Sequence, residues 1–323
     1  MKICITGGAG YIGSVMTEMM VNKGWDITVI DNLEYGQANP LFNLFHTGKV
    51  HFVYGDVTNQ NFMRTFFKGN KFDYIIPLAA VVGFPISEQK PEYTRMVNIN
   101  QILYILSYKN KGAKLIYPNT NSGYGMTEGN IECTEKQELR PTSTYGITKC
   151  EAEDYIRKRE IGNKKSEYVI FRLATVFGMS QRMRTDLMVN NFVHKAYTDK
   201  FLILFERKFV RNFVHIRDVS RAFIFAIEHW NKVRNNVYNL GHPQFNINKL
   251  QLAEIIKKEL PTTEIIFKEG RTDPDKRNYI VSNKKILATG FKFQYPLDKG
   301  IKELIEGYKA MKDHRFKNCE DSG

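Results

Sequence analysis

The sequence predicts an α/β protein with a doubly wound parallel sheet and a smaller, interleaved C-terminal lobe. Apolar runs typical of buried parallel strands alternate with helical patterns from residue 2 to about residue 175. A glycine-rich turn joins the first of these strands to the first helix. Beyond residue 175 the alternation loosens, which favours a small lobe over the crevice at the carboxyl ends of the strands, interleaved with the main sheet.

The expected elements follow from these patterns in chain order. Strands are expected at 2–6, 27–30, 50–54, 74–78, 114–118 and 168–173, and helices at about 11–23, 92–111 and 145–159. Later elements are a helix ending near 198, a strand at 201–205, strands at 213–216 and 237–240 that return to the main sheet around a helix, and helices at 246–260 and 297–312. Asn246 or Asn248 is expected to cap the helix at 246–260.

The glycine turn, Gly7 to Gly13, has the form of a phosphate-binding loop. Gly7 permits the tight turn, Gly10 has no Cβ to keep a pyrophosphate away, and Gly13 lets the helix approach the sheet. The next strand ends at Asp31, and a carboxylate there accepts hydrogen bonds from the adenosine ribose and repels a 2′-phosphate. The pattern predicts a dinucleotide site that favours NAD over NADP. A tight turn without a ligand is the weaker alternative.

Composition excludes several other classes of protein. The chain has 323 residues, 42% of them hydrophobic and 25% charged, as in soluble globular proteins. No stretch reaches the roughly 18 apolar residues of a membrane span, and the N-terminus is already strand, so we expect no signal peptide and a cytoplasmic location. Four cysteines without CxxC spacing and scattered histidines favour reduced thiols and no metal. The net charge of +13 is spread along the chain, which favours a solvated basic surface over nucleic-acid binding.

A tyrosine and a lysine stand four residues apart, at Tyr145 and Lys149, on one face of the expected helix. A nearby cation lowers the pKa of a phenol from about 10 towards the range of a general base. The same spacing recurs twice near the C-terminus, but only this pair follows a strand that ends near a hydroxyl residue, Thr120. We therefore predict Tyr145 as the catalytic base, with Thr120 sharing the substrate's proton.

Together these motifs resemble the extended short-chain dehydrogenase/reductase superfamily, in its nucleotide-sugar epimerase/dehydratase branch. The resemblance spans essentially the whole chain and includes TGGAGYIG, Gly55-Asp56-Val57, Leu78-Ala79-Ala80, Asn98 and the Tyr-x3-Lys pair. It implies an NAD-binding Rossmann domain at 1–175, with a contribution from about 213–243. It also implies a substrate-binding lobe at 176–212 and 244–315, followed by a flexible tail at 316–323.

The resemblance also implies which residues bind each ligand and how the chain assembles. The expected cofactor contacts are Gly7, Gly10, Tyr11, Ile12, Gly13, Asp31, Asn32, Asp56, Val57, Leu78, Ala79, Ala80, Asn98, Tyr145 and Lys149. The expected substrate contacts are Asn121, Ser122, Thr175, Arg184, Asn190, Arg211 and Arg277, the last three at the diphosphate. A homodimer is expected through helices 92–111 and 145–159, which carry Ile102, Leu103, Ile105, Leu106 and Tyr155.

Two positions distinguish the reactions within this branch. In dehydratases of this branch, the catalytic threonine is followed directly by Asp-Glu. In decarboxylating members, a Glu stands two positions after the threonine. Here Asn121 and Ser122 occupy these positions, and neither is an acid. The resemblance therefore implies redox chemistry at C4 of a nucleotide sugar, ending in either net 4-dehydrogenation or 4-epimerisation.

A narrower resemblance concerns the substrate. Stretches such as IPLAAVVGFP and RLATVFGMSQRMRTDLMVNNF resemble a subgroup that oxidises GDP-D-glycero-α-D-manno-heptose at C4 in bacterial capsule biosynthesis. A dehydrogenase of this kind needs its NADH reoxidised, and a 2-oxo acid is a plausible hydride acceptor. A non-catalytic protein that senses NAD is the remaining alternative, and the presence of Tyr145, Lys149 and Thr120 weighs against it.

Overall fold

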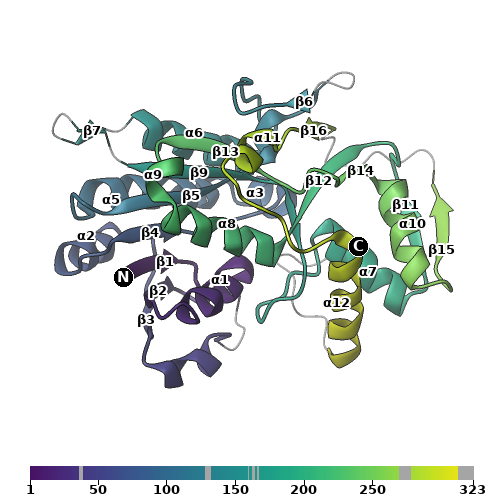
Figure 1. Cartoon of the computed structure of the whole chain (residues 1–323), viewed down its shortest axis with the longest axis horizontal. Coiled ribbons are helices and arrows are strands. Elements are labelled where there is room, and N and C mark those ends of the chain that lie inside the picture. The colour runs from purple at the N-terminus through teal and green to yellow at the C-terminus, as the bar shows by residue number, and fades with distance from the viewer. Residues whose placement is uncertain are drawn as a thin grey trace.

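The main sheet contains seven parallel strands in the order β13-β9-β5-β4-β1-β2-β3 (Figure 1). The computed structural model describes residues 1–35, 39–127, 132–158, 160–161, 164–165, 167–268 and 278–311. The strands of the sheet are β1 (Lys2–Thr6), β2 (Asp26–Asp31), β3 (Val50–Tyr54), β4 (Tyr74–Pro77), β5 (Lys114–Thr120), β9 (Tyr168–Leu173) and β13 (Asn236–Leu240). The strand order reverses between β1 and β4, which is where a doubly wound sheet forms a ligand crevice.

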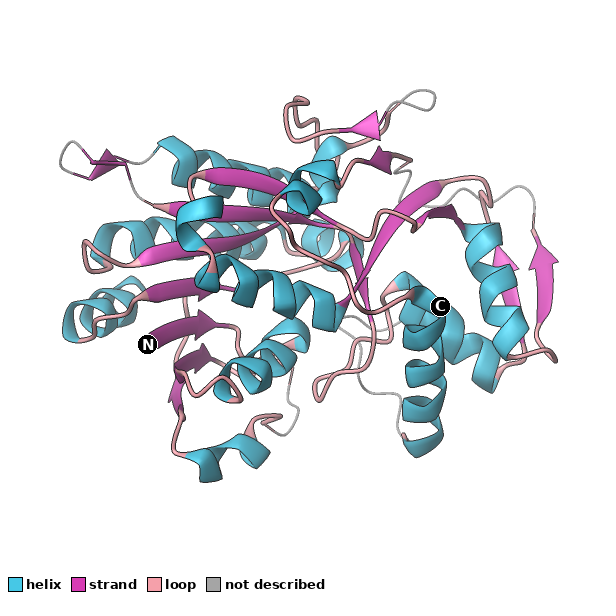
Figure 2. Ribbon diagram, in the orientation of Figure 1, coloured by secondary structure: helices cyan, strands magenta, loops and turns pink. Residues whose placement is uncertain are grey.

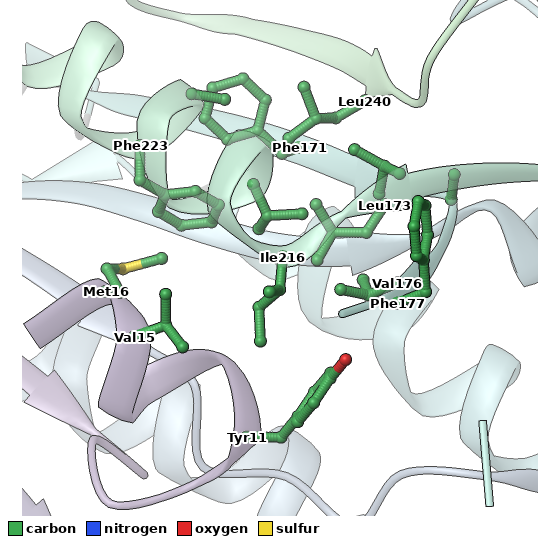
Figure 3. Close-up of a cluster of buried hydrophobic side chains, with 14 of the residues drawn as sticks. Tyr11, Val15, Met16, Phe171, Leu173, Val176, Phe177, Ile216, Phe223 and Leu240 are labelled. Atoms are coloured by element: carbon green, nitrogen blue, oxygen red, sulfur yellow. The ribbon is translucent and has the colours of Figure 1, made fainter. Parts of the chain in front are cut away.

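Helices cover both faces of this sheet because successive side chains of each strand point to opposite sides. In β1, Ile3 and Ile5 lie in one core and Cys4 in the other. The first core contains α1 (Tyr11–Val21) and α8 (Ile216–Glu228), and the second contains α2 (Gln60–Gly69), α5 (Gln101–Tyr108) and α6 (Thr144–Lys158). Figure 3 shows Tyr11 of α1 at the border of the first core, beside Ile216 of α8.

Smaller strands and helices stand apart from the main sheet (Figure 2). One three-stranded sheet contains β10 (Thr175–Phe177), β12 (Val210–His215) and β14 (Asn246–Asn248). Two-stranded sheets are formed by β11 (Phe201–Leu204) with β15 (Glu264–Phe267), β6 (Glu132–Cys133) with β16 (Ile280–Val281), and β7 (Glu160–Ile161) with β8 (Lys164–Lys165). Helices α7 (Met188–Thr198), α10 (Lys249–Glu259) and α12 (Leu297–Ala310) pack against one another beside these strands.

The remaining helical segments are short. They are η1 (Phe42–Thr47), α3 (Phe84–Gln89), α4 (Pro91–Arg95), η2 (Met96–Asn100), η3 (Asn121–Tyr124), α9 (Trp230–Val233) and α11 (Lys284–Ala288). The single helix expected at 92–111 is thus α4, a π-helical turn at η2, and α5. Among the helices that the structure describes, none is long and apolar enough to cross a membrane.

Two expectations for the C-terminal half are wrong. The strand expected at 213–216 does not return to the main sheet, because β13 occupies the place beside β9 and β12 pairs instead with β10 and β14. The helix expected from residue 246 begins at Lys249, because 246–248 is taken up by pairing with β12. Asn248 caps this helix, and its side chain accepts the N–H of Gln251 at 2.9 Å.

The expected dimer contacts also need correction. Ile102, Ile105 and Leu106 are buried inside the protomer, in the core that α5 forms with α2. They are therefore not available for an interface between subunits. Leu103 is half-buried, and Tyr155 is exposed on α6. The tail expected to be flexible, 316–323, lies outside the described residues.

Candidate active site

Two adjoining cavities open at the carboxyl ends of the strands of the main sheet. The glycine-turn cavity contains, among its lining, Gly7, Gly10, Tyr11, Ile12, Gly13, Asp31, Asn32, Asp56, Val57, Leu78, Ala79, Ala80, Tyr145 and Lys149. The threonine cavity contains Thr120, Ser122, Thr175, Tyr145 and Arg184 among its lining. Tyr145 is one of the residues that line both cavities, so it lies where they meet.

The glycine turn is held tightly against the sheet and the first helix. Gly7 has a φ of 69°, and a Cβ on Gly13 would lie 2.4 Å from the carbonyl oxygen of Gly7. Helix α1 begins at Tyr11, directly after the turn, and residues of its first turn line the cavity. The free N–H groups of a helix N-terminus suit a diphosphate. The Asp31 carboxylate accepts the N–H groups of Ala9 at 3.0 Å and Leu33 at 2.9 Å. Its burial raises its pKa, and these hydrogen bonds oppose that change. This donor and acceptor set fits a dinucleotide.

Lys149 lies one helical turn after Tyr145 on α6 and lines the glycine-turn cavity. Its Nζ is 4.1 Å from the centre of the Tyr117 ring, a cation–π contact from the neighbouring strand β5. Burial lowers the pKa of Lys149 to about 7. A pKa in this range makes the charge on Lys149, one helical turn from Tyr145, sensitive to pH around neutrality.

Thr120 is placed by the end of β5 and by the turn that follows. Its hydroxyl donates to Ser122 Oγ at 3.0 Å and accepts the N–H of Ser122 at 3.1 Å. Its own N–H donates to the side-chain oxygen of Asn119 at 2.7 Å. These bonds hold the two hydroxyls together at the wall of the threonine cavity.

A buried ion pair supports this turn, and sequence reasoning missed it. Glu153 accepts the side-chain amide of Asn119 at 2.5 Å and two guanidinium nitrogens of Arg172, at 2.7 and 3.1 Å. All three side chains are buried. Glu153 follows Tyr145 by eight residues on α6, so the i, i+4, i+8 spacing was a signal that it shares the tyrosine's face. The network ties the helix that carries Tyr145 to the strand that carries Thr120.

Two asparagine side chains that we expected to contact ligands instead make hydrogen bonds within the protein. Asn98 accepts the N–H of Val81 and donates to Val81 O and Thr148 Oγ1, at 2.9 to 3.1 Å. Asn190 accepts the N–H of Gly178 and donates to Tyr11 Oη and Arg184 O, at 2.8 to 3.1 Å. Neither residue lines the glycine-turn cavity or the threonine cavity. We correct both assignments, because each amide is buried with its donors and acceptor bound to the protein.

Two other expected substrate contacts, Arg211 and Asn121, do not line the threonine cavity. Arg211 is buried, with its guanidinium carbon 5.7 Å from the centre of the Tyr279 ring. Tyr279 does line the threonine cavity. Asn121 is fully buried, and its amide has no hydrogen-bond partner among the described residues. Arg277 lies outside the described residues.

The structure adds lining residues that the sequence analysis did not single out. At the glycine-turn cavity they include Glu34, Tyr35, Pro40, Tyr93, Asn119 and Arg182. At the threonine cavity they include Val82, Gly83, Phe84, Met126, Thr142, Ser143 and Tyr279. Most come from loops, where no periodic pattern marks a residue as facing a cavity. Arg182 lies within the stretch RLATVFGMSQRMRTDLMVNNF, which the sequence analysis quoted only for its resemblance.

The chemistry available in the threonine cavity is that of hydroxyl groups. Within the described part of the chain, its lining contains several hydroxyl side chains and the cation Arg184, but no carboxylate. The described residues also contain no cluster of His, Cys, Asp or Glu that could hold a metal ion. The arrangement can move a proton to and from a substrate hydroxyl at Tyr145. It offers no described acid for expelling water or carbon dioxide.

Comparison with known proteins shows similarity to enzymes that act on nucleotide sugars. The chain is 29% identical over 285 residues to CDP-paratose 2-epimerase of Salmonella typhi, covering 80% of this chain and 83% of that protein. It is 26% identical over 333 residues to dTDP-D-glucose 4,6-dehydratase of Bos taurus, covering 99% and 91%. The structure of UDP-glucose 4-epimerase from Thermotoga maritima matches with a TM-score of 0.82 and 25% identity, covering 96% of this chain and 99% of the other. The family profile matches residues 3–241, and this chain belongs to the NAD dependent epimerase/dehydratase family.

Proposed function

We propose that this enzyme oxidises C4 of a nucleotide sugar to a 4-keto sugar with NAD. The observation that carries the proposal is the pairing of Tyr145 and Thr120 around a cavity whose described lining has no carboxylate. The 4,6-dehydratase and decarboxylase reactions need such an acid in addition to the redox step. Without one at Asn121 or Ser122, chemistry at C4 is complete when the ketone has formed.

The chain's residues have distinct roles in this scheme. NAD, when bound in the glycine-turn cavity, supplies the acceptor for the hydride that leaves C4. Tyr145 takes the proton of the 4-hydroxyl, and the hydroxyl of Thr120 shares that proton through a hydrogen bond. Lys149 favours the ionised form of Tyr145 when it is itself charged. Ser122 holds Thr120 in place through their mutual hydrogen bonds.

The narrower substrate proposal is GDP-D-glycero-α-D-manno-heptose. It is supported by the resemblance of the segments around 76–85 and 172–192 to enzymes that act on this sugar. The comparisons favour a second outcome, since the Thermotoga relative is a UDP-glucose 4-epimerase. An epimerase would return the hydride to the other face of the same ketone, with the same residues at C4.

The two outcomes differ in what must happen to NADH. A dehydrogenase that releases the ketone retains the reduced cofactor and stops after one turnover. A 2-oxo acid would restart it by accepting the hydride at its carbonyl carbon and a proton from Tyr145, leaving a 2-hydroxy acid. An epimerase needs no such oxidant, because each turnover regenerates NAD.

The test is incubation with GDP-heptose in deuterated water, with and without 2-oxoglutarate. We expect a 4-keto sugar in amounts limited by the bound NAD, rising many-fold when the 2-oxo acid is present. Parallel reactions with UDP-, CDP- and dTDP-sugars identify the nucleotide, and a thermal-shift screen of the same compounds reports binding alone. Accumulation of the C4 epimer without an added oxidant would establish the epimerase in place of the dehydrogenase. Binding of NAD without turnover of any sugar nucleotide would favour an NAD-sensing protein.

A further inference from the structure

The turn that follows strand β4, residues 78–81, forms part of the wall of the glycine-turn cavity, and we call it the alanine turn. Its first three residues line that cavity, and Val82, just beyond it, lines both cavities. At its start the alanine turn abuts the glycine turn, because a Cβ on Gly7 would lie 2.5 Å from the backbone nitrogen of Ala79. The alanine turn therefore runs from the glycine turn towards the place where the two cavities meet.

A buried glutamine, Gln101, joins the alanine turn to the end of strand β1. Gln101 is the first residue of α5, it is 2% exposed, and it lines neither cavity. Its side-chain nitrogen donates to the carbonyl oxygen of Ala79, and its side-chain oxygen accepts the hydroxyl of Thr6 at 3.0 Å. Since Thr6 directly precedes Gly7, this one side chain connects the alanine turn to the glycine turn.

Most backbone groups of the alanine turn are hydrogen-bonded within the protein. The N–H groups of Leu78 and Ala79 donate to the carbonyl oxygen of Thr6, at 2.9 and 2.8 Å. Asn98, in the π-helical turn η2, accepts the N–H of Val81 at 2.9 Å and donates to its carbonyl oxygen at 3.1 Å. Hydrogen bonds from β1 and from η2 thus fix both ends of the alanine turn.

The middle of the alanine turn keeps backbone groups for a ligand. Within the described part of the chain, the N–H of Ala80 and the carbonyl oxygens of Leu78 and Ala80 have no protein partner. In a trans peptide the C=O and the next N–H point in opposite directions. Because Gln101 holds the carbonyl oxygen of Ala79, the N–H of Ala80 is directed away from Gln101.

We propose that Gln101 is a positioning residue for the dinucleotide, because it directs the N–H of Ala80 to the half of NAD that carries the nicotinamide. The inference rests on the proposed use of the glycine-turn cavity for NAD. The hydride acceptor must lie near Tyr145, which takes the proton from the same substrate carbon's hydroxyl. The alanine turn runs from the glycine turn, which suits the diphosphate, towards the junction at Tyr145. A neutral N–H donor there suits the oxygens of the second ribose and of the nicotinamide amide.

The experiment measures the binding of NAD and of ADP by calorimetry, without any sugar nucleotide, to protein freed of dinucleotide. The main variant is Gln101→Met, which has a side chain of similar length that makes neither hydrogen bond. The matched control is Asn110→Leu, since Asn110 holds both backbone groups of Phe72 at 3.1 and 3.2 Å, before the start of β4. A thermal melt of each protein reports folding.

A second pair of variants changes the residue that holds Gln101. Thr6→Val removes the hydroxyl that donates to Gln101, and Thr6→Ser keeps it. Thr6→Val should raise the Kd of NAD because Gln101 loses one of its two hydrogen bonds, and Thr6→Ser should match the wild type.

We expect Gln101→Met to raise the Kd of NAD about fivefold or more, because the N–H of Ala80 is no longer held in position for its hydrogen bond. The Kd of ADP should stay within about twofold of the wild-type value, because ADP lacks the half of NAD that this N–H would contact. Asn110→Leu should lower the melting temperature without changing either Kd.

Several results would overturn the inference. Wild-type affinity for NAD in a folded Gln101→Met protein would show that the alanine turn does not need this hydrogen bond. Equal weakening of NAD and ADP would show that Gln101 supports the cavity as a whole, and an equal loss in Asn110→Leu would trace the effect to the stability of the fold. If Gln101→Met does not fold, equal NAD affinities of Thr6→Val and Thr6→Ser would overturn it instead. Failure of sugar oxidation would leave these binding results intact, so the inference and the proposed function can fail separately.

Discussion

The ammonium group of Lys149 lies 4.1 Å from the centre of the Tyr117 ring, on the helix face that also carries Tyr145. An aromatic face stabilises a cation less than water does, and burial at this position lowers the pKa of the lysine to about 7. The charge next to Tyr145, the proposed base, should therefore depend on pH around neutrality.

The titration of Lys149 can be followed directly. With carbon-13-labelled lysine, we expect one signal to titrate near pH 7 in the ligand-free protein, and Lys149→Met should remove that signal. The unfolded chain has a lysine pKa of about 10.4, so it binds more protons than the folded chain between about pH 7 and 10. Over this range the wild type should gain stability with rising pH relative to Lys149→Met. A Lys149 signal that titrates only near pH 10 would contradict the prediction.

Replacement of Tyr145 tests the base. Tyr145→Phe keeps the ring and removes the proton acceptor, so kcat should fall by at least about 10²-fold while NAD binding persists. Tyr155→Phe, an exposed tyrosine on the same helix, is the matched control and should keep its rate. Near-normal turnover of Tyr145→Phe would exclude this residue as the base.

Replacement of Asp31 tests the choice of cofactor. Asp31→Ala should weaken NAD binding and relax the exclusion of NADP, because the charge that repels a 2′-phosphate is removed. The ratio of the two dissociation constants, measured by fluorescence titration of NADH and NADPH, should shift toward NADPH. Asp26→Ala removes a charge at the other end of the same strand and serves as control. An unchanged ratio would place Asp31 away from the ribose.

Removing one member of the buried Glu153–Arg172 ion pair should destabilise the protein more than removing both. Glu153→Gln leaves the guanidinium of Arg172 buried without its anion, and we expect a loss of about 3 to 5 kcal/mol in the free energy of unfolding. The double variant Glu153→Leu with Arg172→Met should lose less than the single one, since no charge is then buried. Chemical denaturation measures both. A double variant less stable than Glu153→Gln would contradict this prediction.

The homodimer stays a prediction, now through exposed residues in place of the buried ones. Ile147 and Tyr155 of α6 and Met96 of η2 are exposed, with Tyr155 at 46%. We expect these residues to form the apolar contacts of a homodimer, and Tyr155→Glu should raise the dimer dissociation constant by at least tenfold, because it would bury a charge. Light scattering across a micromolar dilution series measures this. A wild-type chain that is monomeric at these concentrations would refute the dimer.

The main sheet and the glycine turn could be predicted because local sequence is enough to specify them. The buried strands are continuous apolar runs, as at Lys2–Thr6, and the turn needs glycine at positions such as Gly7, where φ is positive. Tyr145 and Lys149 could be paired for a similar reason, since one helical turn separates them. These signals lie within a few residues of one another in the chain.

Other features depended on contacts between distant segments. The segment ending at His215 has the apolar pattern of a strand, but its partners were decided by β13, which takes the place beside β9. Asn98 and Asn190 are amides of the kind that bind ligands, and only burial shows that their hydrogen bonds are spent within the protein. Sequence alone determined which residue types could bind or react at each position. The tertiary structure decided which of them face a cavity, because that depends on which neighbours cover each side chain.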